Sequence, residues 1–439
     1  MKADELSAER ARALIEARLG RAPQDALEAA VILEAWGGID ANAAMRLGAE
    51  LTAEPTNLEP SRATTQPAGI RDGGMLAEAL ALVMAVVAIA AWTPPLAEEF
   101  GNSVVKTALQ VALPLTLALQ WGLRRRYLGR LDGLGRLAEN QAVLGLMAVT
   151  ILGALSLFLG LSGALAGLLI ITWVGGIVVV QRGWAMWYGL SMALVAVYLN
   201  LGLPSLGAIA AVAAVTLLTA WFALSSSATA VSYPGSWRGT LAAGLIGGGL
   251  GAMLVADSTV GWGTNGALPA LALVPSMVAS LWAGHHLWDL HEAVPRALRA
   301  VGVGEADTIS WAGPAMAVFT GAVARLAASA CVLSIGAILL GDAIDHTIAT
   351  WSLLFAFGCI ALVMVLISLL ESLSCILWAL LAVSAGFAVE LAVGIWGPVD
   401  VAGGGLTLGA ATAFAVALPM TIMLLVRPGR LLSTSLWIS

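Results

Sequence analysis

The chain has 439 residues, of which 59% are hydrophobic and only 11% are charged, and its mean hydropathy is +0.91. So much apolar surface cannot be buried in one water-soluble core, which excludes an ordinary soluble protein and indicates an integral membrane protein. The net charge of -6 comes largely from the N-terminal region, and the remaining sequence offers no broad basic face for DNA or RNA.

The N-terminal region predicts a small helical cytoplasmic module over residues 1–51. Ser7 can cap a first short helix, Pro23 suits the first turn of a second, and Asp40 can cap a third. About 45 residues are marginal for independent stability, so we expect this module to dock on a protein partner, on itself or on the membrane part. Residues 52–73, rich in Pro, Thr and Ser, predict a flexible linker.

Twelve continuous apolar runs follow, each about 20 residues long, which is enough to cross a membrane as a helix; β-barrel strands would alternate apolar and polar residues instead. The predicted fold is therefore an all-α polytopic membrane protein with two six-helix lobes. The lobes cover residues 74–225 and 239–426, with a cytoplasmic connection at 226–238 and a cytoplasmic tail at 427–439. The predicted spans are about 75–92, 104–122, 142–160, 164–180, 185–203, 206–224, 239–256, 267–286, 314–340, 351–370, 373–396 and 405–426.

The basic residues orient these spans, because Lys and Arg accumulate in cytoplasmic loops. After Gly73, all of them except Lys106 and Arg325 fall in alternate connections or in the C-terminal tail. This pattern predicts a multi-pass protein of the bacterial inner (cytoplasmic) membrane with both termini in the cytoplasm. The residues that follow it are Arg124, Arg125, Arg126, Arg130, Arg136, Arg182, Arg238, Arg296, Arg299, Arg427 and Arg430.

Two groups of short segments carry a family resemblance. After the first span comes Leu-Ala-Glu-Glu-Phe-Gly, and the second span ends in Gly-Leu-Arg-Arg-Arg-Tyr-Leu-Gly; near the C-terminus a glycine-rich turn precedes a helix of small residues. In order and spacing these segments resemble the MOP superfamily, in particular its exporters (flippases) of polysaccharides and lipid-linked oligosaccharides. The segments are 96–101, 122–129, 132–136, 390–394, Gly397 and 403–412.

The resemblance implies two lobes around a central cavity that opens alternately to each side, through which a lipid-linked pyrophosphate and its sugars pass. Several members of the superfamily hold the anionic head group with basic side chains, so Lys106 and Arg325 are the predicted substrate-cavity residues. Each has an alternative. Lys106 could pair with Glu98 or Glu99 at the outer interface, and Arg325 would lie at the cytoplasmic interface if its span began at Gly321.

Glu390 is the predicted proton-coupling residue, because it stands two thirds of the way through the eleventh span. A lone carboxylate inside the membrane is costly unless it meets Arg325, Lys106 or water, so it is expected to be protonated; it can then take up and release a proton as the access to the cavity changes. The alternative is a hydrogen-bonded structural acid near the outer surface. Glu78, Glu371 and Asp257 lie near predicted span ends and are expected to be ordinary interfacial acids.

Other chemistries have weaker signals. His285, Asp289 and Glu292 share a helix face at spacings of four and three and could bind a transition metal, but an amphipathic interfacial helix explains them without further assumptions. The three cysteines follow no CxxC spacing, and no nucleotide-binding loop or nucleophile elbow is present. We therefore predict no metal, no cofactor and no enzymatic activity.

The predicted function is export of a lipid-linked oligosaccharide or polysaccharide by alternating access, with membrane lipid and an anionic or lipid-linked glycan as partners. Two alternatives remain open. The chain could be a membrane glycosyltransferase or polymerase that uses Glu98 and Glu99 as outer-loop acids, or a non-transporting subunit of an envelope polysaccharide assembly complex that docks through residues 1–51.

Overall fold

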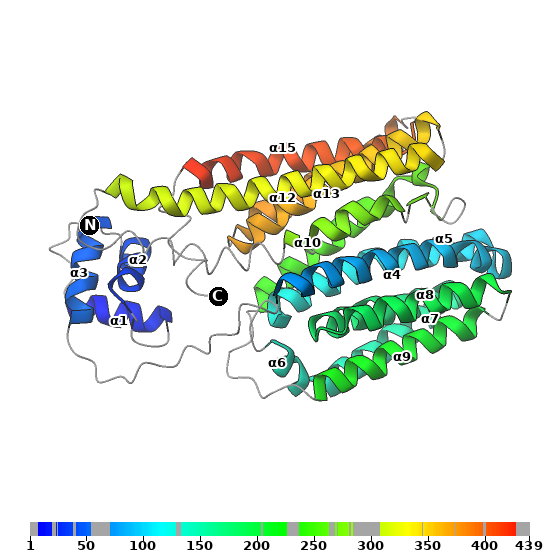
Figure 1. Ribbon diagram of the computed structural model, residues 1–439, viewed down its shortest axis with the longest axis horizontal. Helices are drawn as coiled ribbons and strands as arrows, with labels where there is room; N and C mark the ends of the chain where they lie inside the picture. The colour runs from blue at the N-terminus through cyan, green and yellow to red at the C-terminus, as the bar shows by residue number, and fades with distance from the viewer. Residues whose placement is uncertain are drawn as a thin grey trace.

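In the computed structural model the chain forms helices joined by turns (Figure 1). A small group of helices, α1 to α3, lies at one end of a long helical bundle that holds the others. The description covers residues 8–19, 23, 25–37, 41–53, 71–128, 133–202, 205–225, 237–262, 268–269, 271–280, 282–283, 308–344, 346–373, 375–397 and 401–426.

The described helices include the apolar runs of the sequence, and several extend beyond them. They are α1 (Ala8–Leu19), α2 (Ala26–Gly37), α3 (Ala41–Ala53), α4 (Arg71–Phe100), α5 (Asn102–Leu123), the π-helix η3 (Arg124–Leu128), α6 (Gly133–Glu139), α7 (Gln141–Gln181), α8 (Ala185–Asn200), α9 (Ser205–Ser225), α10 (Trp237–Ala256), the 3-10 helix η4 (Ser258–Val260), α12 (Thr308–Ile344), α13 (Ile348–Ser372), α14 (Ile376–Trp396) and α15 (Gly404–Val426).

Helix α7 is a hairpin of two passes. Its 41 residues would be far too long for one pass, but the backbone at Gly160 has φ 58° and ψ -132°, which breaks the helix. The two arms then lie side by side, since Gly163 abuts the backbone of Leu155 and a Cβ built on Gly167 would be 3.1 Å from the Cα of Leu152. The two spans predicted at 142–160 and 164–180 are therefore both present.

The predicted polytopic all-α fold is confirmed. Within the described residues, nine helices are long and apolar enough to cross a membrane, and α7 counts among them as one although it makes two passes. Two shorter apolar helices, Ala185–Asn200 and Leu271–Ser280, fall within the two remaining predicted spans, 185–203 and 267–286. The first set of six is α4, α5, the two arms of α7, α8 and α9; the second set is α10, Leu271–Ser280 and α12 to α15.

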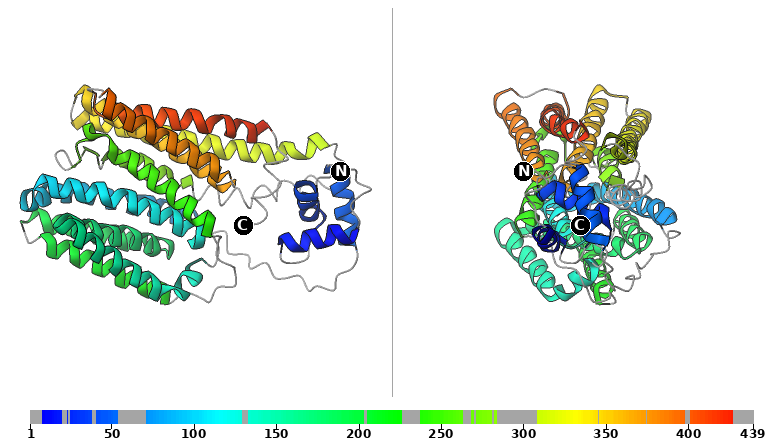
Figure 2. Two further views of the ribbon diagram at one scale, coloured as in Figure 1. Left: turned by 180° about the vertical axis from the view of Figure 1, so that it is seen from behind. Right: turned by 90° about the vertical axis from the view of Figure 1, so that its left-hand side faces the viewer.

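Helix α10 joins the two sets. Within the first set α4 packs on α8, and α7 packs on both α5 and α9; within the second set α15 packs on α13 and α14, and α12 on α13. Helix α10 packs along α5 on one side and α14 on the other (Figures 1 and 2). Arg124 to Arg126 lie at the end of the bundle where α4 begins and α15 finishes, which we call the basic end.

Glycines bring α10 and α5 into close contact. Gly247 lies against the carbonyl of Leu117, and a Cβ built on Gly251 would be 2.5 Å from the Cα of Pro114. Such close approach is how membrane helices gain packing energy, because lipid supplies no hydrophobic drive between them. The resulting contact belongs to one large core that contains residues of both six-helix sets.

Helices α1 to α3 have a small apolar core of their own, which includes Ile15, Ile32 and Leu33. Met45 on α3 packs both against this core and against the large core of the bundle. The module boundary at residue 51 and the lobe boundaries stay predictions, because residues 54–70, 226–236 and 427–439 lie outside the described part of the chain.

The glycine contact predicts a difference between two substitutions on α10. Gly247→Ala should lower the free energy of unfolding by about 1–3 kcal/mol, because the new Cβ would overlap the backbone of Leu117. Gly244→Ala is the matched control one turn away, where a Cβ would sit 3.4 Å from the carbonyl oxygen of Ala118. Melting temperatures in detergent, measured by size-exclusion chromatography after heating, should fall for Gly247→Ala alone. Equal melting temperatures would contradict the close contact.

Candidate functional site

Glu390 lies on α14 and is 2% exposed. Neither of its carboxyl oxygens has a hydrogen-bond partner among the residues that the structure describes. Burial of an ionised carboxylate without a hydrogen-bond donor is costly, so this environment favours the protonated form of the side chain. The sequence prediction of a lone acid inside a span thus coincides with an unsatisfied group in the structure.

Asp257 follows the last residue of α10 and is 9% exposed. Its Oδ1 accepts hydrogen bonds from the backbone N–H of Thr259 at 2.9 Å and from the Thr259 hydroxyl at 2.5 Å. Its Oδ2 accepts from the backbone N–H of Leu406 in the first turn of α15 at 3.2 Å. Asp257 therefore caps η4 and also fastens the end of α10 to the start of α15.

Gly405 lies between the two acids. A Cβ built on Gly405 would be 3.1 Å from Oδ2 of Asp257 and 3.7 Å from Cγ of Glu390. The two carboxyl side chains are therefore no farther apart than the sum of these distances, and a larger residue than glycine would separate them. We call this site the Asp257–Glu390 pair.

The pair is electrostatically unequal. Asp257 has three donors, whereas Glu390 has none among the described residues. No Lys, Arg or His of the described chain forms an ion pair with either acid. A proton on Glu390 would supply the missing donor, since a protonated carboxyl group donates one hydrogen bond. The site can thus hold one proton between two acids of different environments.

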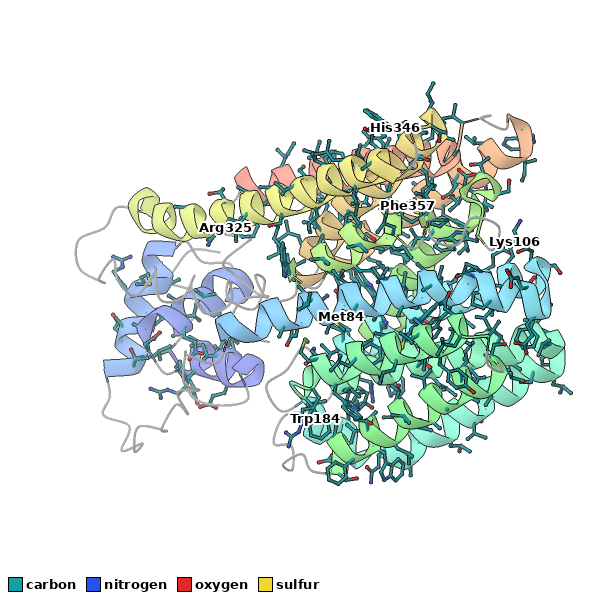
Figure 3. All side chains as sticks on the ribbon, turned by 45° about the vertical axis from the view of Figure 1, so that its right-hand side comes forward. Met84, Lys106, Trp184, Arg325, His346 and Phe357 are labelled. Atoms are coloured by element: carbon teal, nitrogen blue, oxygen red, sulfur yellow. The ribbon has the colours of Figure 1, made fainter. Side chains whose placement is uncertain are left out.

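Lys106 lies near the end of the bundle opposite the basic end, on the first turns of α5 (Figure 3). It is partly exposed and forms no ion pair with the described residues. The alternative pairing with Glu98 or Glu99 is not seen there. Glu99 instead accepts hydrogen bonds from the hydroxyl and from the backbone N–H of Ser205, the latter at 3.2 Å.

Arg325 is exposed on α12, and its Nε donates to the carbonyl of Gly321 on the same helix at 3.1 Å. It lies in the part of the apolar stretch Phe319–Ala343 that is nearer the basic end (Figure 3). The structure therefore does not bring Lys106 and Arg325 to one place, and neither forms an ion pair with Glu390. Their role as cavity residues stays a prediction.

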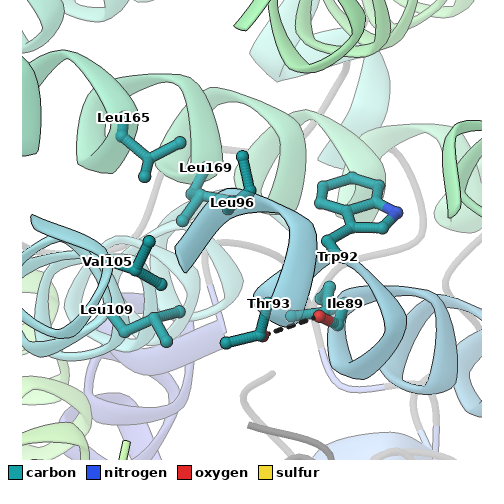
Figure 4. A pocket seen from close by; sticks show the side chains of 8 residues that line it. All are labelled: Ile89, Trp92, Thr93, Leu96, Val105, Leu109, Leu165 and Leu169. Carbon is teal, nitrogen blue, oxygen red and sulfur yellow. Dashed lines mark hydrogen bonds between the residues drawn. The ribbon is translucent and has the colours of Figure 1, made fainter. Parts of the chain in front are cut away.

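The described residues enclose one notable small cavity, between α4, α5 and the second arm of α7 (Figure 4). Trp92, Thr93 and Leu165 are among its lining residues, and the Thr93 hydroxyl donates to the carbonyl of Ile89 at 3.0 Å. The cavity volume is about 10 Å³. Pockets for drug-sized ligands measure about 300–1,000 Å³. This cavity is therefore too small to serve as a substrate site in this conformation.

His285, Asp289 and Glu292, the alternative metal ligands, lie outside the described residues. Within the described ranges, no group of three His, Cys, Asp or Glu side chains is placed to hold a metal ion. The metal alternative at residues 285–292 stays a prediction.

Sequence reasoning missed the role of Asp257, which it predicted to be an ordinary interfacial acid. The local signal was the Asp257-Ser258-Thr259 sequence after a glycine-rich helix, since an Asp followed by Thr two residues later is typical of a capped turn. Its bond to Leu406 had no local signal, because 149 residues separate the two.

Comparison with known proteins adds a likeness of overall structure. No protein-family model and no curated protein sequence matches the chain. An outward-facing multidrug resistance MATE family transporter of the MOP superfamily aligns with 81% of this chain and 96% of its own, at 12% identity and a TM-score of 0.47.

Two further solved structures align over a comparable share of the chain. The MATE multidrug transporter DinF-BH, solved in complex with a ligand, aligns with 82% of this chain and 96% of its own, at 14% identity and a TM-score of 0.46. A MOP superfamily transporter from Pyrococcus furiosus aligns with 80% and 93%, at 13% identity and a TM-score of 0.39.

The hydrogen bonds of Asp257 predict its contribution to stability. Asp257→Ala should lower the free energy of unfolding by about 2–3 kcal/mol, because the donors of Thr259 and Leu406 lose a charged acceptor. Asp257→Asn should cost less, since its one remaining carbonyl oxygen can still accept from Thr259. Thr412→Ala is the control, because Thr412 is exposed on α15 and bonds only to the carbonyl of Leu408. Melting temperatures of the purified proteins in detergent would measure this order, and equal values for all three variants would contradict it.

Proposed function

We propose that the chain is an exporter of the bacterial inner membrane, with its basic end in the cytoplasm, that moves its substrate between the two six-helix sets by alternating access. Twelve passes in two sets of six support this proposal, as does the placement of α10 in contact with both sets. The resemblance of the terminal segments to polysaccharide and lipid-linked oligosaccharide exporters suggests the substrate class.

The observation that carries the proposal is the unsatisfied, buried carboxyl group of Glu390 beside Asp257. When protonated, Glu390 supplies its own hydrogen-bond donor and the site can stay closed to water. When ionised, it needs water or a cation, so the contact of α14 with α15 and the end of α10 must loosen. A proton taken up from the outside and released to the cytoplasm would thereby drive export in the opposite direction.

The first candidate substrate is a lipid-linked oligosaccharide. Because Lys106 and Arg325 lie toward opposite ends of the bundle, they would contact its anionic group at different stages of transport rather than together. A second candidate is an amphipathic molecule with little negative charge. The specific observation that favours it is that Lys106 and Arg325, the two predicted cavity residues, lie toward opposite ends of the bundle.

The two alternatives to transport make different predictions. Glu98 and Glu99 are both exposed, but Glu99 is hydrogen-bonded to Ser205 at the start of α9, which weakens the case for a pair of catalytic acids. A non-transporting subunit that docks through residues 1–51 would support no transport in vesicles that contain this protein alone. Reconstitution therefore separates both alternatives from an exporter.

The test uses proteoliposomes with an imposed pH gradient. Glu390→Gln should abolish proton-driven transport and flatten its pH dependence, because glutamine fills the same space but cannot release a proton. Glu98→Gln, an exposed acid toward the same end of the bundle, should transport like the unsubstituted chain. A fluorescent lipid-linked oligosaccharide and a fluorescent amphipathic cation would be assayed side by side to distinguish the two substrate candidates. Unchanged transport and unchanged pH dependence in Glu390→Gln would refute the coupling role.

A further inference from the structure

Two consecutive arginines at the basic end reach from the first six-helix set to the second. Helix α5 continues into the π-helix η3, which carries Arg125 and Arg126. Nη1 of Arg125 lies 3.5 Å from the backbone carbonyl oxygen of Glu371, to which it donates, and 3.9 Å from the Glu371 carboxylate. Glu371 is in the last turn of α13, the span whose residues are most deeply buried.

Arg125 stabilises both the C-terminal carbonyl groups of α13 and the carboxylate of Glu371. The last carbonyl groups of α13 have no partner within the helix and carry partial negative charge, which a cation stabilises. The side chain of Glu371 is 7% exposed, so its carboxylate would be costly without a charged partner. The side chain of Arg125 is 35% exposed and lies where water can reach it. The burial of Glu371 thus favours the ion pair, and the partial exposure of Arg125 allows water to replace the pair when the two helices separate.

Arg126, the next residue, contacts α10. Its guanidinium carbon lies 3.7 Å from the ring centroid of Trp237 at the start of α10, and its Nε donates to the Tyr127 hydroxyl at 3.1 Å. Stacking of a guanidinium group on tryptophan is a favourable cation–π contact. It ties η3 to α10, while the neighbouring Arg125 contacts α13. Single π-turns of this kind are frequent at functional sites.

We propose that Arg125 and Glu371 form a latch that holds the basic end closed between α5 with α10 on one side and α13 on the other. The latch rests on the proposed function, since alternating access requires that this end open when substrate enters from the cytoplasm. Opening exchanges the ion pair for water at both charges. The Arg126–Trp237 contact does not open, because both of its residues belong to the α5–α10 pair.

The latch is tested by distances rather than by transport. Spin labels would be placed at Ser225→Cys, at the end of α9, and Leu377→Cys, near the start of α14, both exposed at the basic end. The native cysteines Cys331, Cys359 and Cys375 would be replaced by alanine. Glu371→Gln should shift the electron–electron resonance distance distribution toward longer values and raise the ratio of open to closed molecules about threefold to tenfold.

Controls separate the latch from a general loss of structure. Asp342→Asn removes an acid that pairs with His346 four residues away, so it should leave the distances unchanged. Arg125→Gln should reproduce the effect of Glu371→Gln, and the double variant should open no further than either single one, because both remove the same interaction. If Glu371→Gln fails to elute as a monodisperse protein, Arg125→Gln, whose side chain is partly exposed, carries the measurement.

The outcomes are decisive in both directions. Unchanged distances in Glu371→Gln and Arg125→Gln would overturn the latch, and so would fully additive shifts in the double variant. These measurements need neither substrate nor a pH gradient. A failure of Glu390→Gln to affect transport would therefore refute the proposed coupling and leave the distance result to be judged by itself.

Discussion

The close contact between α5 and α10 is the constraint on which the rest of the structure depends. In a membrane, helices gain little by hiding apolar side chains from lipid that is equally apolar, so tight backbone contact must supply the packing energy. Gly247 and Gly251 allow that contact on the face of α10 toward α5. The two ends of α10 are then fixed in space: Trp237 meets Arg126 at one end, and Asp257 meets α15 at the other.

The sequence predicted the passes well because hydropathy and segment length are local properties. Even the hairpin in α7 follows from two apolar runs separated at Gly160 and the neighbouring small residues. Helix ends were less predictable. Helix α12 begins at Thr308 and extends beyond its apolar stretch, since a helix can continue into water wherever its residues permit it. For that reason the sequence left the depth of Arg325 open, and only the structure places it toward the basic end.

The pairing of charges could not be predicted in the same way. Glu390 stood out because an acid inside an apolar run is locally conspicuous, whereas Asp257 and Glu371 looked like ordinary acids at span ends. Their partners are distant in sequence: 149 residues separate Asp257 from Leu406, and 246 separate Arg125 from Glu371. The alternation of basic residues accounts for Arg125 as an ordinary cytoplasmic arginine, so nothing in the sequence predicted its contact with Glu371.

Helix α10 links the two charged sites physically. Its 20 residues span about 30 Å, from Trp237 at the basic end to the turn at Asp257. Since α10 is packed along α5, a displacement at the Asp257–Glu390 pair cannot move α10 without α5 and η3. The Arg126–Trp237 contact would move with them, while Glu371 on α13 stays with the other helices of the second set. In the proposed cycle, loss of the proton from Glu390 would therefore displace Arg125 relative to Glu371. That is where α5 and α10 must separate from α13.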